Sequence, residues 1–287
     1  MNKVRKKRRI AERTSVTFQI VIVATLSLVA LCQIFPFWLQ IASALQPLDL
    51  VPEDGKIYIL PVSWNFKNFA EAMSRVELMQ GMQNSLIVTF GYLLLSTVFI
   101  LLMGYTLGKK RFRGKTAVKV CMLMTMAVPG ELLMVSNYLL VSELGWINRY
   151  SGLILPGLVN VTGIFLLMSF MNTIPDAMLE SAELDGAGEI RKIFQMVVPL
   201  SLPILATYWI LTFVAQWNDY LWPMIVTNKR EFFTVQLKLK EFNPYYFGFA
   251  DETLKSAAHI LTLVPVIVLY LLCQKQFIEG ISVTGLK

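Results

Sequence analysis

The chain has 287 residues, of which 55% are hydrophobic and only 16% are charged. Soluble domains are about 45–50% apolar and about 25% charged, so this surplus of apolar residues cannot be buried in one soluble core. The net charge of +7 would point to nucleic acid in a soluble protein, but in a membrane protein the placement of the basic residues matters more. Composition therefore excludes a soluble, nucleic-acid-binding protein and indicates a polytopic helical membrane protein.

Six continuous apolar runs are long enough to cross a bilayer, because its hydrocarbon core of about 30 Å takes roughly 20 residues of helix. The predicted spans are residues 16–41, 82–108, 117–141, 152–172, 200–226 and 257–274. They predict an all-α membrane protein with six transmembrane helices. Ala42-Ser43-Ala44 has the small-residue form of a signal-cleavage site. The apolar stretch before it exceeds the roughly 7–15 residues of a signal peptide, so we expect the first span to be retained.

Lysine and arginine counts in the connections predict the orientation, because cytoplasmic loops carry the excess of these residues. Residues 1–15 carry seven and residues 109–116 carry five. With two each in 172–199 and 275–287, one side has sixteen against nine on the other. Residues 227–256 supply five of those nine and are a mild contrary signal. We therefore expect both termini in the cytoplasm.

This orientation predicts the organisation of the whole chain. We expect a cytoplasmic basic tail at 1–15, the first transmembrane helix at 16–41, an extracytoplasmic segment at 42–81, a five-helix core at 82–274 with a cytoplasmic loop at 175–199, and a cytoplasmic tail at 275–287. The three cysteines lie in apolar runs and the chain has one histidine. No catalytic residue, disulfide framework or metal site is expected from that pattern.

The loop between the fourth and fifth spans has the most informative pattern. Pro175 suits the first turn of a helix, where its missing N–H is not needed. In the helix that would follow, Asp176, Glu180 and Glu183 fall on one face. Gly186 is well placed to end this helix with a positive φ.

A second amphipathic segment follows, with Ile190, Ile193, Phe194 and Val197 at helical spacing before Pro199 leads into the fifth span. The two segments predict a helix–turn–helix on the cytoplasmic surface. Small residues at its corner would let the backbone of another protein approach closely. From these residues alone, an interfacial amphipathic connector without a partner is the alternative.

The same loop resembles a family motif. Glu180-Ser181-Ala182, three residues, Gly186, nine residues and Met196-Val197-Val198-Pro199 are similar to the EAA loop of ABC importer permeases. The pattern of that family is Glu-Ala-Ala, three residues, Gly, nine residues, Ile-x-Leu-Pro. The departures are near-isosteric and leave the spacing intact.

Further segments resemble the carbohydrate-importing branch of the family. They are the extended loop 180–187, the segment Trp217-Asn218-Asp219-Tyr220-Leu221-Trp222-Pro223 and the C-terminal residues 277–287. Six spans with both ends inside also match the smaller of the two permeases in maltose-type importers. The resemblance covers roughly residues 80–287, and the N-terminal third adds little.

The resemblance implies a maltose-type ABC importer permease fold with a cytoplasmic coupling helix. It implies a permease subunit of a binding-protein-dependent importer that translocates a carbohydrate, with an oligosaccharide expected, across the cytoplasmic membrane. The implied partners are a second permease in a heterodimer, two ATP-binding-cassette subunits and an extracytoplasmic solute-binding protein. The residues implied to contact the ATPase are Glu180, Ser181, Ala182, Asp185, Gly186, Ala187 and Pro199.

In that family ATP and Mg²⁺ are bound by the partner ATPase subunits, so no cofactor and no enzyme activity are expected in this chain. Gly114-Lys115-Thr116 is its nearest approach to a nucleotide-binding loop, but the glycine required five positions earlier is Lys109. An alditol or glycerol-phosphate permease is the alternative within the family. An ion-coupled secondary carrier and an integral-membrane enzyme are alternatives outside it.

Two groups of residues are candidates to line a substrate path. Glu131 lies near the middle of the third predicted span, directly after Pro129-Gly130, where the backbone is expected to break. It would line the path or pair with another subunit, unless the span is misplaced. The second group, expected at the outer end of the fifth span, is Trp217, Asn218, Asp219 and Tyr220. The alternative for this group is an interfacial aromatic belt. For His259 we expect a local pairing, with a proton relay as the alternative.

Overall fold

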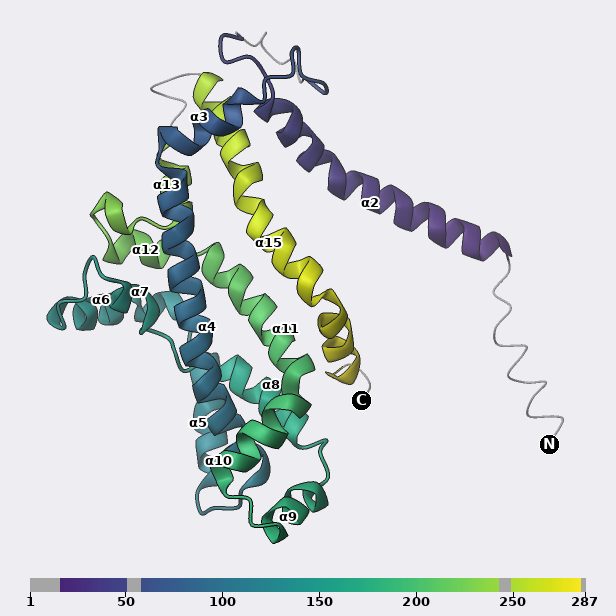
Figure 1. Cartoon of the computed structure of the whole chain (residues 1–287), viewed down its shortest axis with the longest axis vertical. Helices are drawn as coiled ribbons and strands as arrows, with labels where there is room; N and C mark the ends of the chain where they lie inside the picture. Colours follow the sequence, from purple (N-terminus) through teal and green to yellow (C-terminus); the bar gives the residue numbers. More distant parts are fainter. Residues whose placement is uncertain (1–15, 51–57, 243–248, 285–287) are drawn as a thin grey trace. The chain divides into compact units, whose positions relative to one another are not determined.

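The computed structural model describes residues 16–50, 58–242 and 249–284, and helices are the only regular elements within these ranges (Figure 1). The predicted tail 1–15 lies outside the described residues. The chain divides into two compact units, one of Met1–Ala72 with Asn243–Ile260 and one of Met73–Phe242 with Leu261–Lys287.

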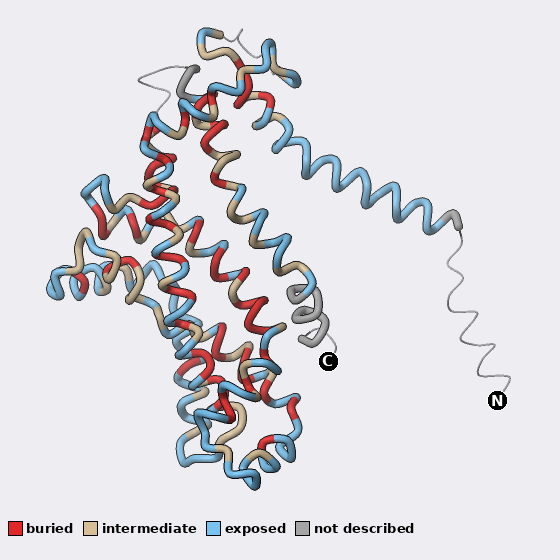
Figure 2. Tube along the Cα trace, viewed as in Figure 1, coloured by how far each residue is buried: buried red, intermediate tan, exposed pale blue. Residues whose placement is uncertain are grey.

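The first unit contains helix α2 (Val16–Ala44), which begins at the predicted residue and ends three residues later than predicted. It is long and apolar enough to cross a membrane. Its side chains are exposed along most of its length (Figure 2). Its 29 residues are enough to cross the hydrocarbon core of a bilayer, which takes roughly 20 residues of helix.

Polar side chains hold the C-terminal end of α2 to its neighbours in the first unit. The Gln40 Nε2 and His259 Nδ1 atoms are 2.9 Å apart, so the expected local pairing of His259 is confirmed. Asn68, at the start of α3 (Lys67–Arg75), is fully buried and donates from Nδ2 to the carbonyl oxygens of Ala44 and Gln46, each at 2.8 Å. These bonds satisfy carbonyl groups at the helix end that have no partner within the helix.

The second unit contains most of the helices (Figure 1). In chain order they are α4 (Leu78–Lys109), α5 (Lys115–Met126), η1 (Gly130–Leu133), α6 (Met134–Glu143), α7 (Tyr150–Ile154), α8 (Val161–Met171), α9 (Asp176–Leu184), α10 (Glu189–Lys192), the π-helical turn η2 (Ile193–Val197), α11 (Val198–Trp217), α12 (Leu221–Val226), η3 (Arg230–Phe232) and α13 (Val235–Lys240). Helix α15 (Phe249–Thr284) begins in the first unit and ends in this one.

Helix α4 is the centre of the second unit and packs against α8, α11 and α13. Gly104 of α4 faces Leu167 of α8, and Gly163 of α8 faces Ile100 of α4. Small residues at these crossings let the helices approach closely, which is how helices associate in lipid. Tyr208 of α11 and Ser96 of α4 are both buried, and the Tyr208 Oη donates to the Ser96 Oγ at 2.8 Å.

The Leu78 end of α4 binds the segment that contains η3 and α13. Lys238 of α13 is fully buried, and its Nζ lies 2.9 Å from the Glu77 Oε2. This hydrogen bond and charge hold the pKa of Glu77 below its ordinary value. Asn84 donates from Nδ2 to the carbonyl oxygens of Glu231 and Phe233 at 2.8 and 2.9 Å. The segment is therefore held on α4 by buried polar bonds.

The third predicted span, 117–141, is two helices that meet at an angle of 93°. The bend lies between Met126 and Gly130, so the break expected at Pro129-Gly130 is confirmed. Proline has no N–H to donate and its ring clashes with the preceding turn, which explains the position of the bend.

The helices found at the fourth and fifth predicted spans have different bounds from those predicted. Within 152–172, α7 ends at Ile154 and α8 begins only at Val161, after a turn with Gly157 at a φ of +77°. The long helix at the fifth predicted span runs from Glu189 to Trp217 rather than over 200–226. The described residues thus contain four helices long and apolar enough to span a membrane, or up to six spans if each of two bent pairs counts as one.

The close crossing of α8 with α4 and α11 gives a stability prediction. A Cβ atom at Gly163 would overlap Ile100 Cδ1 and lie 2.8 Å from a ring carbon of Tyr208. We expect Gly163→Leu to lower the free energy of unfolding by about 1–3 kcal/mol through overpacking. The measurement is the melting temperature, taken as the temperature at which the detergent-solubilised protein loses its monodisperse peak. The matched control is Gly130→Leu, because no atom lies within 4 Å of a Cβ there; equal melting temperatures for the two variants would contradict the packing.

Candidate functional site

Helix α9 has well-formed signals at both of its ends. Pro175 precedes its first residue with an extended backbone, at φ −61° and ψ 135°. Gly186 follows the helix with a φ of +78°. The Gly186 N–H donates to the Glu183 carbonyl at 3.0 Å, and the Ala187 N–H donates to the Ala182 carbonyl at 2.9 Å. This pair of bonds is a Schellman closure, so the positive φ predicted for Gly186 is confirmed.

One face of α9 packs inward and the other is open. Leu179 is buried, whereas Glu180, Ser181, Asp185 and Gly186 are exposed. Leu184 has 90% of its surface exposed. The outer face of α9 is therefore accessible, with one apolar side chain among polar ones. Ala182 and Ala187 are half-buried beneath this surface.

The first turn of α9 is attached to the last turn of α4. Lys109 Nζ lies 2.6 Å from the Asp176 Oδ1 and also donates to the carbonyl oxygen of Ile174. The Lys109 side chain is only 8% exposed, while that of Asp176 is 67% exposed. The ammonium group is therefore held beneath α9, and the aspartate reaches in from the surface.

The last turn of α9 is attached through a second lysine. Lys192 of α10 has a side chain that is 2% exposed, and its Nζ lies 3.0 Å from the Glu183 Oε2 and 2.7 Å from the Glu189 Oε1. The same Glu189 accepts from Lys110 Nζ at 2.7 Å and from the Tyr105 hydroxyl at 2.9 Å. Its carboxylate raises the pKa of Lys110 above the ordinary value. These bonds connect α9, α10 and α4.

Sequence reasoning missed this network. Lys109 and Lys110 counted only as basic residues that set the orientation, and Lys192 carried no signal of its own. The single available hint was the i, i+4, i+7 spacing of Asp176, Glu180 and Glu183, which groups the acids on one face without indicating their partners.

The segment after α9 differs from the predicted separate surface helix. Helix α10 continues through the π-helical turn into α11 as one helix, and the Val198 N–H donates to the Ile193 carbonyl five residues earlier. Pro199 is exposed at the second position of α11 and has no N–H to offer the preceding turn, which favours the wider π turn at that point. Pro199 thus lies at the junction of α10 with α11.

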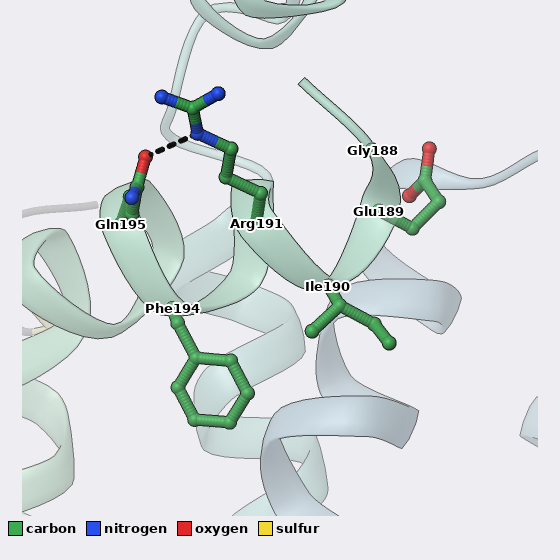
Figure 3. Close-up of a pocket in the computed structure, with 6 residues that line it drawn as sticks. All are labelled: Gly188, Glu189, Ile190, Arg191, Phe194 and Gln195. Atoms are coloured by element: carbon green, nitrogen blue, oxygen red, sulfur yellow. Dashed lines mark hydrogen bonds between the residues drawn. The ribbon is translucent and has the colours of Figure 1, made fainter.

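An open hollow lies over α10 and the π turn. Its walls are Gly188, Glu189, Ile190, Arg191, Phe194 and Gln195. Ile190 and Phe194 are 73% and 67% exposed and extend to one side, while Arg191 extends to the other and donates from Nε to the Gln195 Oε1 at 2.8 Å (Figure 3). The apolar pair enlarges the exposed surface next to α9.

The candidate path residues have different surroundings. Glu131 is exposed in η1, and its carboxylate has no hydrogen-bond or ion-pair partner among the described residues. Trp217 is 1% exposed, donates from Nε1 to the Thr262 carbonyl at 3.2 Å and stacks on Phe213. It therefore belongs to the packing between α11 and α15.

Asn218, Asp219 and Tyr220 form the break between α11 and α12. The Asn218 Oδ1 accepts from Gln236 at 3.2 Å, and the Asp219 Oδ1 accepts from the N–H of Trp222 at 3.3 Å. Tyr220 presents its ring to Lys240 at 5.8 Å. The structure brings these three together at a helix end, while Trp217 faces the core.

Comparison with known proteins identifies the family. A family model described as "Binding-protein-dependent transport system inner membrane component" matches residues 100–282. The chain belongs to this family. It is therefore an inner-membrane permease of a binding-protein-dependent ABC importer, as the EAA-like loop implied.

Individual relatives extend the similarity over nearly the whole permease. It is 28% identical to the arabinooligosaccharides transport system permease protein AraQ of Bacillus subtilis (strain 168), over 94% of this chain and 96% of the relative. It is 30% identical to the melibiose/raffinose/stachyose import permease protein MelC of the same organism, over 91% and 94%. Since these matches cover the N-terminal third, the similarity reaches further than the motifs alone indicated.

A solved structure supports the same fold. The permease matches a chain in the crystal structure of a bacterial ABC transporter involved in the import of the acidic polysaccharide alginate, with a TM-score of 0.82, 25% identity and coverage of 93% of this chain and 98% of that one. The expected all-α ABC importer permease fold is confirmed.

The Schellman closure of α9 gives a second prediction. Gly186→Val places a β-branched residue at a φ of +78°, which costs about 1–2 kcal/mol in the left-handed region, whereas Asn tolerates that region. We expect Gly186→Val to open the C-terminal end of α9 to proteases and Gly186→Asn to leave it protected. The measurement is limited proteolysis of the purified permease. Equal protection in both variants would show that the positive φ is dispensable.

Proposed function

We propose that this permease translocates an oligosaccharide, powered by ATP hydrolysis in separate subunits that dock on α9. The observation that carries the proposal is the form of α9: a short helix closed at both ends, attached on its inner face and open on its outer face. The substrate class is supported by the relatives, since two of them are named for the import of arabinooligosaccharides and of raffinose-type sugars.

The docking surface is assigned to the exposed residues of the loop. Glu180 and Ser181 lie on the outer face, and Asp185 and Gly186 lie at the exposed end of the helix. Ala182 and Ala187 have small side chains, so the backbone of a docked subunit can approach closely at these positions. Pro199 contributes by shaping the junction of α10 with α11 rather than by direct contact.

The subunits that complete the importer are two ATPases, which bind ATP and Mg²⁺, a second permease in a heterodimer and an extracytoplasmic binding protein. No nucleotide site is assigned to this chain, because Lys109 stands where a phosphate-binding loop needs glycine and is engaged with Asp176. Docking of ATPases on α9 requires the loop to be cytoplasmic. The excess of basic residues on that side supports this orientation and cytoplasmic termini.

The surroundings of Glu131 indicate that another subunit or the substrate covers the surface at the bend between α5 and α6. Its exposed carboxylate lies among the exposed apolar residues Val128, Leu132 and Leu133. A carboxylate facing lipid is expensive, so this surface faces the second permease or the substrate path. We assign Glu131, Asn218, Asp219 and Tyr220 to the path, and Trp217 to the packing behind it.

The docking assignment predicts a specific loss. We expect Glu180→Arg to reduce retention of the ATPase subunits on the purified importer by about tenfold or more, as for a residue central to an interface. The measurement is the stoichiometry of subunits after affinity purification. The control is Glu143→Arg, the same substitution at an exposed position at the end of α6. Full retention by Glu180→Arg would contradict docking on α9.

The path assignment predicts a different phenotype. We expect Glu131→Gln to lower uptake by about tenfold, because an amide replaces a carboxylate acceptor for sugar hydroxyl groups, while ATPase retention stays unchanged. The measurement is initial uptake of labelled raffinose and arabinotriose by cells with and without the permease. Unchanged uptake in the variant would remove Glu131 from the path. Uptake of neither sugar by the unaltered importer would refute the proposed substrate class.

A further inference from the structure

The three acidic residues on one face of α9, which form an acidic stripe, have two different structural roles. Asp176, Glu180 and Glu183 share one helical face, yet the outer two are bonded within the chain and the central one is not. Asp176 pairs with Lys109 at 2.6 Å and Glu183 pairs with Lys192 at 3.0 Å. The Glu180 carboxylate has no hydrogen-bond or ion-pair partner among the described residues, so it is the acid of the stripe left for an external contact.

The two lysines are the buried members of their pairs. The side chains of Lys109 and Lys192 are 8% and 2% exposed, whereas those of Asp176 and Glu183 are 67% and 68% exposed. A buried ammonium group is strongly unfavourable without a counter-charge, so each lysine holds its carboxylate at a defined place. The first and last turns of α9 are thus each held by a buried lysine on the inner side of the helix.

Both attachments lead to α4. Lys109 belongs to the last turn of α4 itself. Lys192 connects Glu183 to Glu189, and the Glu189 carboxylate accepts from Tyr105 and Lys110 at the same end of α4. A force applied to the outer face of α9 therefore reaches α4 through two separate polar contacts, seven residues apart on α9.

We propose that Lys109 and Lys192 are positioning residues for energy coupling, which hold the two ends of α9 on α4 so that a displacement of α9 moves α4 with it. This inference rests on the proposed docking of the ATPase subunits on α9. Loss of either lysine lets α9 pivot on its remaining attachment. ATP hydrolysis then continues, because the docking face is intact, but less of the motion reaches the membrane helices.

The test uses the complete importer reconstituted in liposomes, with transport and ATP hydrolysis measured on the same sample. The transported probe is whichever of raffinose and arabinotriose the unaltered importer carries. The variants are Lys192→Met, Lys192→Arg and Glu183→Ala, the last at an exposed helical position where alanine favours folding. The control is Arg113→Met, an exposed basic residue in the connection between α4 and α5.

We expect the sugar transported per ATP hydrolysed to fall roughly fivefold or more in Lys192→Met and in Glu183→Ala, the lower range of a typical coupling energy. ATPase subunits stay bound at full stoichiometry in both variants. Lys192→Arg restores most of the ratio because it keeps the buried charge, and Arg113→Met keeps the original ratio. A lysine that only supported folding would change the yield of importer without changing this ratio.

An unaltered ratio in Glu183→Ala and Lys192→Met would overturn the inference. If Lys192→Met fails to assemble, Glu183→Ala decides, since it removes the same bond from the exposed side. Loss of ATPase subunits in these variants, as expected for Glu180→Arg, would place Glu183 and Lys192 in docking and also overturn the positioning role. Absence of ATPase subunits from the unaltered importer would instead refute the proposed function itself.

Discussion

Close packing of α8 and α11 on α4 is the interaction on which the rest of the second unit depends. Lipid tails are as apolar as leucine side chains, so burial of apolar surface does little to bring helices together in a membrane. The contacts come instead from small residues such as Gly104 and Gly163 and from hydroxyl bonds such as Tyr208 to Ser96. Each of these joins α4 to one neighbour, and together they make α4 the common support.

The two ends of α4 hold polar segments by the same device. At one end the buried Lys238 pairs with Glu77, and Asn84 binds two carbonyl groups of the segment around η3. At the other end Lys109 and Lys192 hold α9. In each case a buried ammonium group meets a more exposed carboxylate. This arrangement keeps the charge compensated while leaving the outer surface of the attached segment open, and it makes α4 a physical connection between the two ends of the unit.

Breaks in the helices follow from residues that cannot continue a helix. Pro129 coincides with the bend between α5 and α6, and Pro199 follows the π-helical turn, where the helix widens without breaking. Breaks of this kind free backbone groups, which a membrane tolerates only where protein or a wet cavity covers them. The exposed Glu131 and the polar residues between α11 and α12 lie next to such breaks. The single chain leaves these surfaces uncovered, which is consistent with a subunit built to work in a larger assembly.

The sequence by itself determined the features that depend on local chemistry. Apolar runs showed the helical membrane class, Pro129 marked a bend, and Pro175 with Gly186 delimited α9, because backbone conformation at proline and glycine depends on the residue itself. The spacing of the EAA-like loop was sufficient to indicate the family. The end of α11 at Trp217 was not predicted. Only Asn218 and Asp219 interrupt the apolar residues there, and a polar pair this short did not divide the predicted span 200–226.

Tertiary structure alone decided which polar side chains meet. Lys109 and Asp176 are 67 residues apart, and Glu77 and Lys238 are 161 apart. No periodicity within one helix connects such pairs, and before folding each of these lysines is equivalent to any other basic residue near a membrane surface. Trp217 shows the same limit, since only the packing of α15 decided that its indole faces Thr262 rather than a substrate. The type of each element follows from residues that are neighbours in the sequence. The partner of each charged side chain does not, because the pairing depends on how distant helices pack.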